Sequence, residues 1–418
     1  MRIKIKKFVS FQSLVMWVGL LCVVSYALLE HMSISITEFS AVKMPLLYVG
    51  GICVIPLLKT FFANILKRRY FFVFLVLFAL CAFLLFSMEY NRNTVSGFSP
   101  EYNTNRLILY LLELFVLMMV FAEKGKSQEA IRFVYRYVLL LVVLSDIIMF
   151  TKLFVFGTKA FPNYLIGTKF TISYMHLNLL VFWSIRQGER RRDNSVRKWF
   201  FWVAAVAVAL IAVYVDCMTG VLGTAFLVWL MVRRSGTRKQ SKLLTTPVFL
   251  LISIFLCTLF AFVVGFFLDI PVITSFIEDV LGRDTTLTGR MNIYHEYGSA
   301  MEGHWLWGYG YGSGNTVSMQ YFACANAQNA VLHWILQCGL VCTSFLIMLF
   351  MLIMKQVNAG YKKHKGTIDL LVALVYTYLV LGTVEITYSM SFILFMALLF
   401  MVVNDEKRDG QANKALRA

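Results

Sequence analysis

The sequence predicts an all-α, polytopic integral membrane protein with about twelve transmembrane helices and one long outer loop that contains short helices. Hydrophobic residues make up 59% of the 418 positions and charged residues only 15%, whereas a soluble domain is nearer half apolar and a quarter charged. Apolar runs near the roughly 20 residues that cross a bilayer recur from Phe8 to Val403. No loop is long enough for a sizeable soluble domain, so we expect a single membrane domain over residues 1–418.

Hydropathy places the expected spans along the whole chain. They cover residues 8–29, 44–66, 70–88, 107–122, 137–156, 164–185, 199–215, 218–232, 246–268, 326–354, 367–384 and 390–403. The first span follows the basic segment Met1 to Lys7 and is too long for the apolar core of a signal peptide. We therefore expect an uncleaved first helix.

The basic residues indicate the orientation of these spans. A net charge of +17 would suggest a nucleic-acid partner in a soluble protein, but most of the 39 Lys and Arg residues fall in alternate loops. The positive-inside rule then places both termini in the cytoplasm and the opposite loops outside. We expect the bilayer, and no nucleic acid, as the partner of this basic charge.

The outer loop at 269–325 is the longest and is rich in glycine, aromatic and polar residues, so we expect function there first. Residues 274–282 predict a short amphipathic helix, and residues 290–302 predict a second one. In the second helix Arg290, Tyr294 and Tyr297 share one face, at positions i, i+4 and i+7. An arginine beside two tyrosines suits a polyanion or a sugar.

A glycine and aromatic run, Trp305 to Gly314, follows this helix. Glycines between aromatic residues allow tight turns and leave the rings of Trp307 and Tyr309 available to stack on sugars. A tight loop with rings that anchor at the membrane interface is the alternative interpretation. Gln328 and Asn329 then lead into the next span, which carries His333 and ends near Gly339.

This order of motifs resembles the O-antigen polymerase and ligase superfamily, with its Wzy-like polymerases and WaaL-like ligases. The matching residues are Gly289-Arg290, Ile293-Tyr294, Trp307-Gly308-Tyr309-Gly310-Tyr311-Gly312, Gln328-Asn329 and Gly339-Leu340. The resemblance implies that the chain polymerises polyprenyl-pyrophosphate-linked oligosaccharide repeat units into capsule, O-antigen or exopolysaccharide on the outer face of the bacterial cytoplasmic membrane. It also implies a chain-length regulator or a flippase as a partner.

Two departures from the family pattern narrow this expectation. The ligase branch has a histidine where this chain has Gln328, an amide that cannot accept a proton near neutral pH, so a ligase is disfavoured. The outer turn Asp216 to Gly220 lacks the arginine of the family, and Lys169 is the candidate to replace it.

The implied chemistry needs a cation near the departing pyrophosphate. Arg290 is the first candidate, followed by Arg283 and Lys169; the alternative for Arg290 is a salt bridge with Asp284 or Glu296. Candidate bases for the acceptor hydroxyl are Glu302, His304 and His333, with His295 and Asp216 as further titratable options. Candidate substrate contacts are Tyr294, Tyr297, Trp307, Tyr309, Gln328 and Asn329. Because pyrophosphate is already a good leaving group, we expect no metal and no cofactor.

Ionisable residues inside the spans support a rival hypothesis, a transporter or flippase of lipid-linked oligosaccharide. Glu113 and Asp146 lie within predicted spans, as do Lys59 and Lys152. The structural alternative is that these groups pair with one another, for example Lys59 with Glu113.

Overall fold

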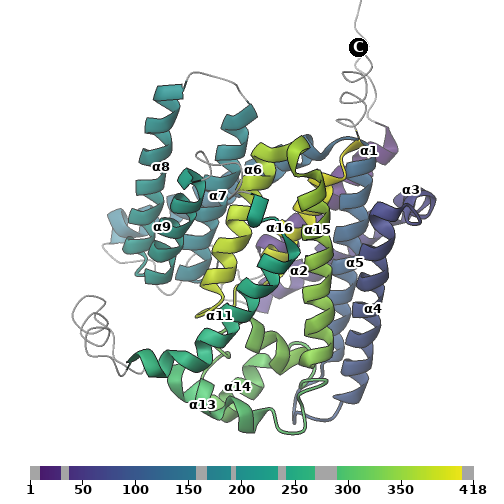
Figure 1. The fold of residues 1–418 in the computed structure, drawn as a ribbon, viewed down its shortest axis with the longest axis vertical. Coiled ribbons are helices and arrows are strands. Elements are labelled where there is room, and N and C mark those ends of the chain that lie inside the picture. Colours follow the sequence, from purple (N-terminus) through teal and green to yellow (C-terminus); the bar gives the residue numbers. More distant parts are fainter. Residues whose placement is uncertain are drawn as a thin grey trace, which may run out of the picture. The chain divides into compact units, whose positions relative to one another are not determined.

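The computed structural model describes residues 10–29, 37–156, 167–189, 194–233, 242–268 and 290–406, and all regular structure in these ranges is helical (Figure 1). The elements are α1 (Phe11–Leu28), α2 (Thr37–Val54), the 3-10 turn η1 (Ile55–Leu57), α3 (Leu58–Asn64), α4 (Arg68–Tyr90), α5 (Glu101–Glu123), α6 (Ser127–Phe156), α7 (Lys169–Glu189), α8 (Asn194–Tyr214), α9 (Met218–Arg233), α11 (Pro247–Leu268), α13 (Arg290–Ala300), α14 (Gly314–Phe322), α15 (Ala330–Leu381) and α16 (Met390–Val403). The prediction of an all-α fold is confirmed for this part of the chain.

Seven helical segments of the described residues are long and apolar enough to cross a membrane. They are Phe11–Leu28, Lys43–Asn64, Arg68–Tyr90, Glu101–Glu123, Ser127–Val155, Ala330–Lys362 and His364–Leu381. Four further apolar helices are shorter, between 10 and 17 residues. Every predicted apolar segment overlaps one of the described helices. The chain is therefore a helical membrane protein by the length and composition of its helices.

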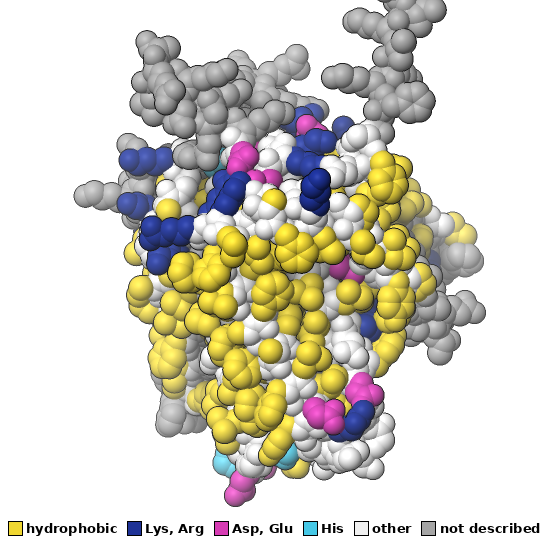
Figure 2. Space-filling model, turned by 90° about the vertical axis from the view of Figure 1, so that its right-hand side faces the viewer, with side chains coloured by type: hydrophobic (Ala, Val, Ile, Leu, Met, Phe, Trp, Pro, Cys, Tyr) yellow, Lys and Arg dark blue, Asp and Glu magenta, His cyan; other side chains and the backbone are white. Residues whose placement is uncertain are grey.

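Large hydrophobic side chains lie on the surface of these helices. On α4 the exposed residues include Phe72, Leu75, Phe78 and Phe86. Hydrophobic side chains also cover most of the face drawn in Figure 2. A soluble monomer rarely exposes such continuous apolar surface, whereas lipid chains solvate it at no cost.

The chain divides into two compact units. Unit 1 contains Met1–Phe71, Leu109–Val221 and Ala397–Ala418, and unit 2 contains Phe72–Ile108 and Leu222–Met396. Within unit 1, α1 packs along α2, and α6 packs along α7, which in turn contacts α8. Within unit 2, α11 packs along α15, and α13 contacts both α11 and α14. The candidate residues of the 290–333 region therefore all belong to unit 2.

Three predicted spans fall on helical segments with irregular geometry. The predicted span 44–66 corresponds to the apolar segment Lys43–Asn64, in which the α-helical hydrogen bonding breaks because Pro56 lies in the 3-10 turn between α2 and α3. A proline lacks the N–H that would continue the helical hydrogen bonds. The predicted spans 326–354 and 367–384 fall in one helical element, α15, which leaves helical geometry at Gly339 and at His364.

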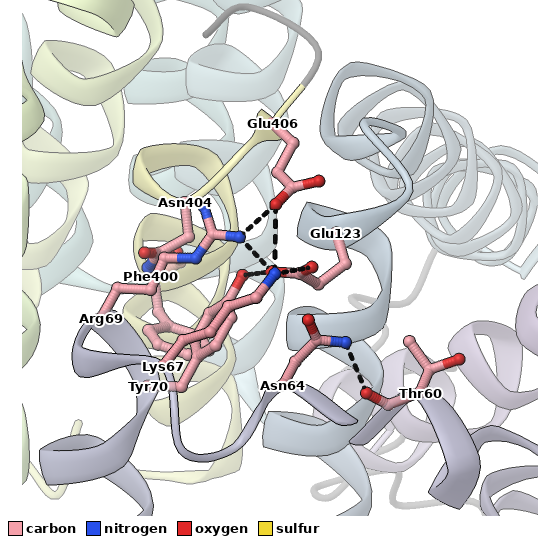
Figure 3. Close-up of polar contacts among 9 residues, drawn as sticks. All are labelled: Thr60, Asn64, Lys67, Arg69, Tyr70, Glu123, Phe400, Asn404 and Glu406. Carbon is pink, nitrogen blue, oxygen red and sulfur yellow. Dashed lines mark hydrogen bonds and ion pairs between the residues drawn. The ribbon is translucent and has the colours of Figure 1, made fainter. Parts of the chain in front are cut away.

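A cluster of charged groups joins three distant segments of unit 1 (Figure 3). Glu123, at the end of α5, accepts hydrogen bonds from Lys67 Nζ at 2.8 Å and from the Tyr70 hydroxyl at 2.6 Å. Arg69 forms ion pairs with both Glu123 and Glu406, the latter just after α16. Since the cations lie in a predicted cytoplasmic loop, this cluster ties the three helix ends together on the side where the sequence places the termini.

Replacing Glu123 by glutamine should lower the free energy of unfolding by about 1–3 kcal/mol, because the partly buried Arg69 and the exposed Lys67 lose the buried carboxylate that they share. The measurement is the thermal unfolding midpoint in detergent. Glu101→Gln is the matched control, since Glu101 pairs with an exposed Arg92, and such surface pairs contribute at most about 1 kcal/mol. Equal midpoints for the two variants would contradict a stabilising role for this cluster.

Candidate functional site

The face of α13 that carries Arg290, Tyr294 and Tyr297 anchors this helix to other parts of unit 2. Arg290, the first residue of α13, donates from Nη2 to Oε1 of Glu385 at 3.0 Å. The Tyr294 hydroxyl donates to the carbonyl of Gln328 at 3.1 Å, and the Tyr297 hydroxyl donates to the carbonyl of Leu332 at 2.7 Å. The prediction of a helix beginning at Arg290 is confirmed, although α13 ends at Ala300 rather than Glu302.

The Arg290 and Glu385 pair lies in a mostly buried position. The exposed fractions of the two side chains are 19% and 10%. Charge-assisted hydrogen bonds of this kind hold a guanidinium in a defined orientation, and this contact uses one of its five N–H donors. Sequence reasoning considered Asp284 and Glu296 as partners and missed Glu385, which is 95 positions away.

The two tyrosines of this face act as neutral hydrogen-bond donors. Burial raises the pKa of Tyr294 to about 12, and burial raises the pKa of Tyr297 well above its ordinary value. Both rings are enclosed by protein, with the ring of Tyr297 stacked on that of Phe322 in α14. In this conformation their contacts attach α13 to the start of α15.

Gln328 and Asn329 shape the beginning of α15. The Asn329 side chain accepts hydrogen bonds from the backbone N–H groups of Val331 and Leu332, both at 3.1 Å. Its oxygen therefore caps the helix. Its amide nitrogen donates to the carbonyls of Cys257 and Thr383, so both ends of this buried amide have hydrogen-bond partners. Gln328 precedes it in the left-handed region, with φ of 51°.

The glycine and aromatic run crosses the interruption of α15 at Gly339. Leu340 N donates to Trp305 O at 2.8 Å, and Tyr309 N donates to Leu336 O at 3.0 Å. Gly308 and Gly339 both have positive φ, and a Cβ on either would meet the backbone of the other segment. These two glycines therefore allow two backbones to approach closely enough to exchange hydrogen bonds.

Two aromatic side chains of this run, Trp307 and Tyr309, contact other side chains of unit 2. The Trp307 ring lies 4.5 Å from that of Phe86, measured between centroids. Tyr309 stacks on His304 at 3.9 Å and donates from its hydroxyl to Ala300 O. Burial also raises the pKa of Tyr309. The structure thus places Trp307 and Tyr309 in protein contacts.

The three candidate bases lie in different surroundings. Glu302 is exposed in the turn after α13, and the His304 Nδ1 lies 3.3 Å from Gly308 O. His333, on the first turns of α15, packs its ring against Gly314. Its Nδ1 is buried and has no hydrogen-bond partner among the described residues.

The remaining candidate cations are Lys169 and Arg283. Lys169, in unit 1, pairs with Asp216 at 3.1 Å, and Asp216 has a positive φ of 55°. Sequence reasoning named both residues but did not pair them. Arg283, Gly289 and the predicted helix 274–282 lie outside the described residues.

The predicted pairing of Lys59 with Glu113 is wrong. Glu113 is 2% exposed, and its carboxylate packs against Gly50 and Gly51 of α2 with no hydrogen-bond partner among the described residues. Lys59 is exposed on α3, beyond the break at Pro56. That break removes Lys59 from the regular continuation of α2.

All eight cysteines are free thiols, and the described ranges contain no group of three or more His, Cys, Asp or Glu side chains placed to hold a metal ion. A scan against protein-family models and searches of curated proteins and of solved structures find no match to this chain. The interpretation of the site therefore depends on its residues and their geometry.

Gly308→Ala should reduce the free energy of unfolding by about 2 kcal/mol or more, because the added Cβ combines backbone strain with overlap against the Gln337–Gly339 backbone. Gly298→Ala is the matched control: a Cβ there meets no atom within 4 Å, so alanine should stabilise α13 by about 0.5–1 kcal/mol. Chemical or thermal unfolding in detergent measures both. A Gly308→Ala variant as stable as the parent would rule out the proposed backbone contact.

Proposed function

We propose that this protein is a membrane glycosyltransferase that polymerises polyprenyl-pyrophosphate-linked oligosaccharide repeat units into capsule, O-antigen or exopolysaccharide. The donor and the acceptor are both lipid-linked glycans at the membrane surface. The order of motifs from Gly289 to Leu340 supports this proposal. The observation that carries it is the oriented, mostly buried guanidinium of Arg290.

The reaction is a displacement at the anomeric carbon of the donor. The acceptor hydroxyl oxygen forms the new C–O bond, the bond to pyrophosphate breaks with its electron pair, and the hydroxyl proton passes to a base or to water. Arg290 stabilises the charge that develops on the pyrophosphate, since a guanidinium matches phosphate oxygens geometrically. Glu385 is the positioning residue, because it holds Arg290 without contacting the substrate.

The other candidates have supporting roles in this proposal. Arg283 is a further candidate cation for the diphosphate, Lys169 stays a candidate cation of unit 1, and Glu302, His304 and His333 are candidate bases. Of the three, His333 has a buried ring nitrogen without a described hydrogen-bond partner. Electrostatic stabilisation and positioning provide the rate acceleration, so the reaction needs no metal.

The proposal includes the topology on which this chemistry depends. About twelve spans cross the bacterial cytoplasmic membrane, both termini are cytoplasmic, and residues 269–325 face outward. Lipid-linked repeat units then reach Arg290 from the outer leaflet.

Arg290→Ala should reduce polymer formation at least about 100-fold, because the leaving group loses its charge stabilisation. Arg290→Lys should restore only part of the activity, since an ammonium lacks the planar fork. The measurement is the length distribution of surface polysaccharide in the host strain, normalised to protein level. Lys355→Ala is the control, as this exposed lysine lies in a predicted cytoplasmic loop. Long polymer from both Arg290 variants at normal protein level would refute the proposed role.

Cysteine accessibility tests the topology. In a background with the native cysteines replaced, a cysteine at the exposed position His295 should react with a membrane-impermeant maleimide in intact cells. A cysteine at Lys355 should react only after the cells are permeabilised. Protection of the His295 position in intact cells, with labelling after permeabilisation, would place the proposed site in the cytosol and exclude the function.

A second candidate function is a transporter or flippase of lipid-linked oligosaccharide, and a specific observation favours it. Glu113 is a buried carboxyl without a described partner inside a membrane helix, which is typical of ion-coupled transport. The two functions differ in their product, since only a polymerase makes longer glycans. Purified protein is incubated in detergent with a synthetic lipid-linked repeat unit, and extended glycan products identify a polymerase. A ligase-type transferase is the third alternative, and Gln328 disfavours it.

A further inference from the structure

The packed pair of α6 and α7, in unit 1, contains a histidine and an aspartate in direct contact. The Nε2 atom of His176 lies 3.3 Å from Oδ2 of Asp146. The other ring nitrogen, Nδ1, lies 2.9 Å from the carbonyl oxygen of Ile172, one helical turn earlier. Both nitrogens of the ring therefore face an oxygen atom.

This arrangement determines where the protons are. A backbone carbonyl can only accept a hydrogen bond, so Nδ1 must carry a hydrogen and donate it to Ile172 O. A neutral imidazole has a single N–H, which would leave the Nε2 lone pair facing the Asp146 carboxylate. Two acceptors in contact repel each other, and one additional proton between Nε2 and Oδ2 converts that repulsion into a charge-assisted hydrogen bond.

We propose that His176 and Asp146 form a proton-binding site, in which one proton is shared between His176 Nε2 and Asp146 Oδ2. The loaded site is an imidazolium and carboxylate pair of zero net charge. This site is independent of the reaction proposed for unit 2.

The surroundings of the pair favour a retained proton. The exposed fraction of the His176 side chain is 7%, and that of Asp146 is 27%. Met149 and Ile172 belong to a buried apolar cluster in the same part of α6 and α7. Asp146 also borders a surface hollow of about 470 Å³ along α6, lined by Ile147, Phe150 and Phe154 among others.

Other titratable groups lie on the elements packed around the site. They include Lys152 on α6, Lys169 and Tyr174 on α7, Tyr214 at the end of α8, and Asp216 and Cys217 just after it. Lys169 and Asp216 neutralise each other, and Cys217 is buried in the apolar cluster. His176 therefore remains the group in direct contact with Asp146.

Loss of this proton has a structural consequence. Without the shared proton, the Asp146 carboxylate faces the lone pair of His176 Nε2 across the contact between α6 and α7, in surroundings where water is scarce. The two helices then repel each other locally, so proton binding is coupled to the packing of α6 against α7. Ionisable groups that bind protons inside membrane helices are the basis of proton relays and of proton-coupled transport.

Nitrogen-15 NMR of histidine-labelled protein in detergent tests the proposal, and the chain has only six histidines. His176→Gln assigns the signals of this ring by their loss. When the site holds its proton, both nitrogens of His176 should resonate as protonated. The exposed His295 is the internal comparison.

Asp146→Asn is the decisive variant, because the asparagine amide can donate to Nε2 and removes the need for the additional proton. His176 should then become a neutral ring protonated at Nδ1, while the signal of His295 stays unchanged. If Asp146→Asn does not fold, the parent protein alone decides the question. A His176 ring that is neutral and protonated at Nε2 in the parent, or spectra that are identical in the parent and Asp146→Asn, would overturn the proposal.

Discussion

The absence of water in the lipid core is the constraint on which the rest of this structure depends. Each backbone N–H and C=O inside a membrane needs a partner within the protein, so a helix can be interrupted only where another segment replaces the lost hydrogen bonds. The interruption of α15 at Gly339 meets this condition. Residues 305–309 exchange backbone hydrogen bonds with residues 336–341 on both sides of it. The glycine and aromatic run thus supplies backbone hydrogen-bond partners to α15 where that helix is interrupted.

The same constraint governs the charged side chains. The mostly buried Arg290 has Glu385, and Glu123 has two cations and a tyrosine hydroxyl. Charges placed in this way cost little to bury and hold helix ends together. Glu113 differs because no described group balances its carboxylate. Arg290 and Glu123 thus have an evident role in holding the fold together, whereas the carboxyl of Glu113, unpaired among the described residues, suggests a role beyond the fold.

Much of the candidate site was predictable where the pattern is local. The helical period placed Arg290, Tyr294 and Tyr297 on one face, and α13 confirms that face. The period could not indicate what the face contacts. Tyr297 lies against α14 and α15 rather than in an open position, and the partner of Arg290 comes from a turn 95 positions away. Contacts at such separations depend on how helices pack, which one sequence does not record.

The sequence by itself determined the solvent of this protein and the type of its secondary structure, because an apolar run of helical length has few alternatives in a membrane. The sequence also indicated where the backbone can turn tightly, because glycine adopts positive φ without strain. Only the tertiary structure decided that Gly308 and Gly339 meet, that Lys59 and Glu113 do not, and that His176 lies beside Asp146. The physical reason is that packing energy arises from shape and distance between helices, whereas hydropathy and periodicity describe one helix at a time.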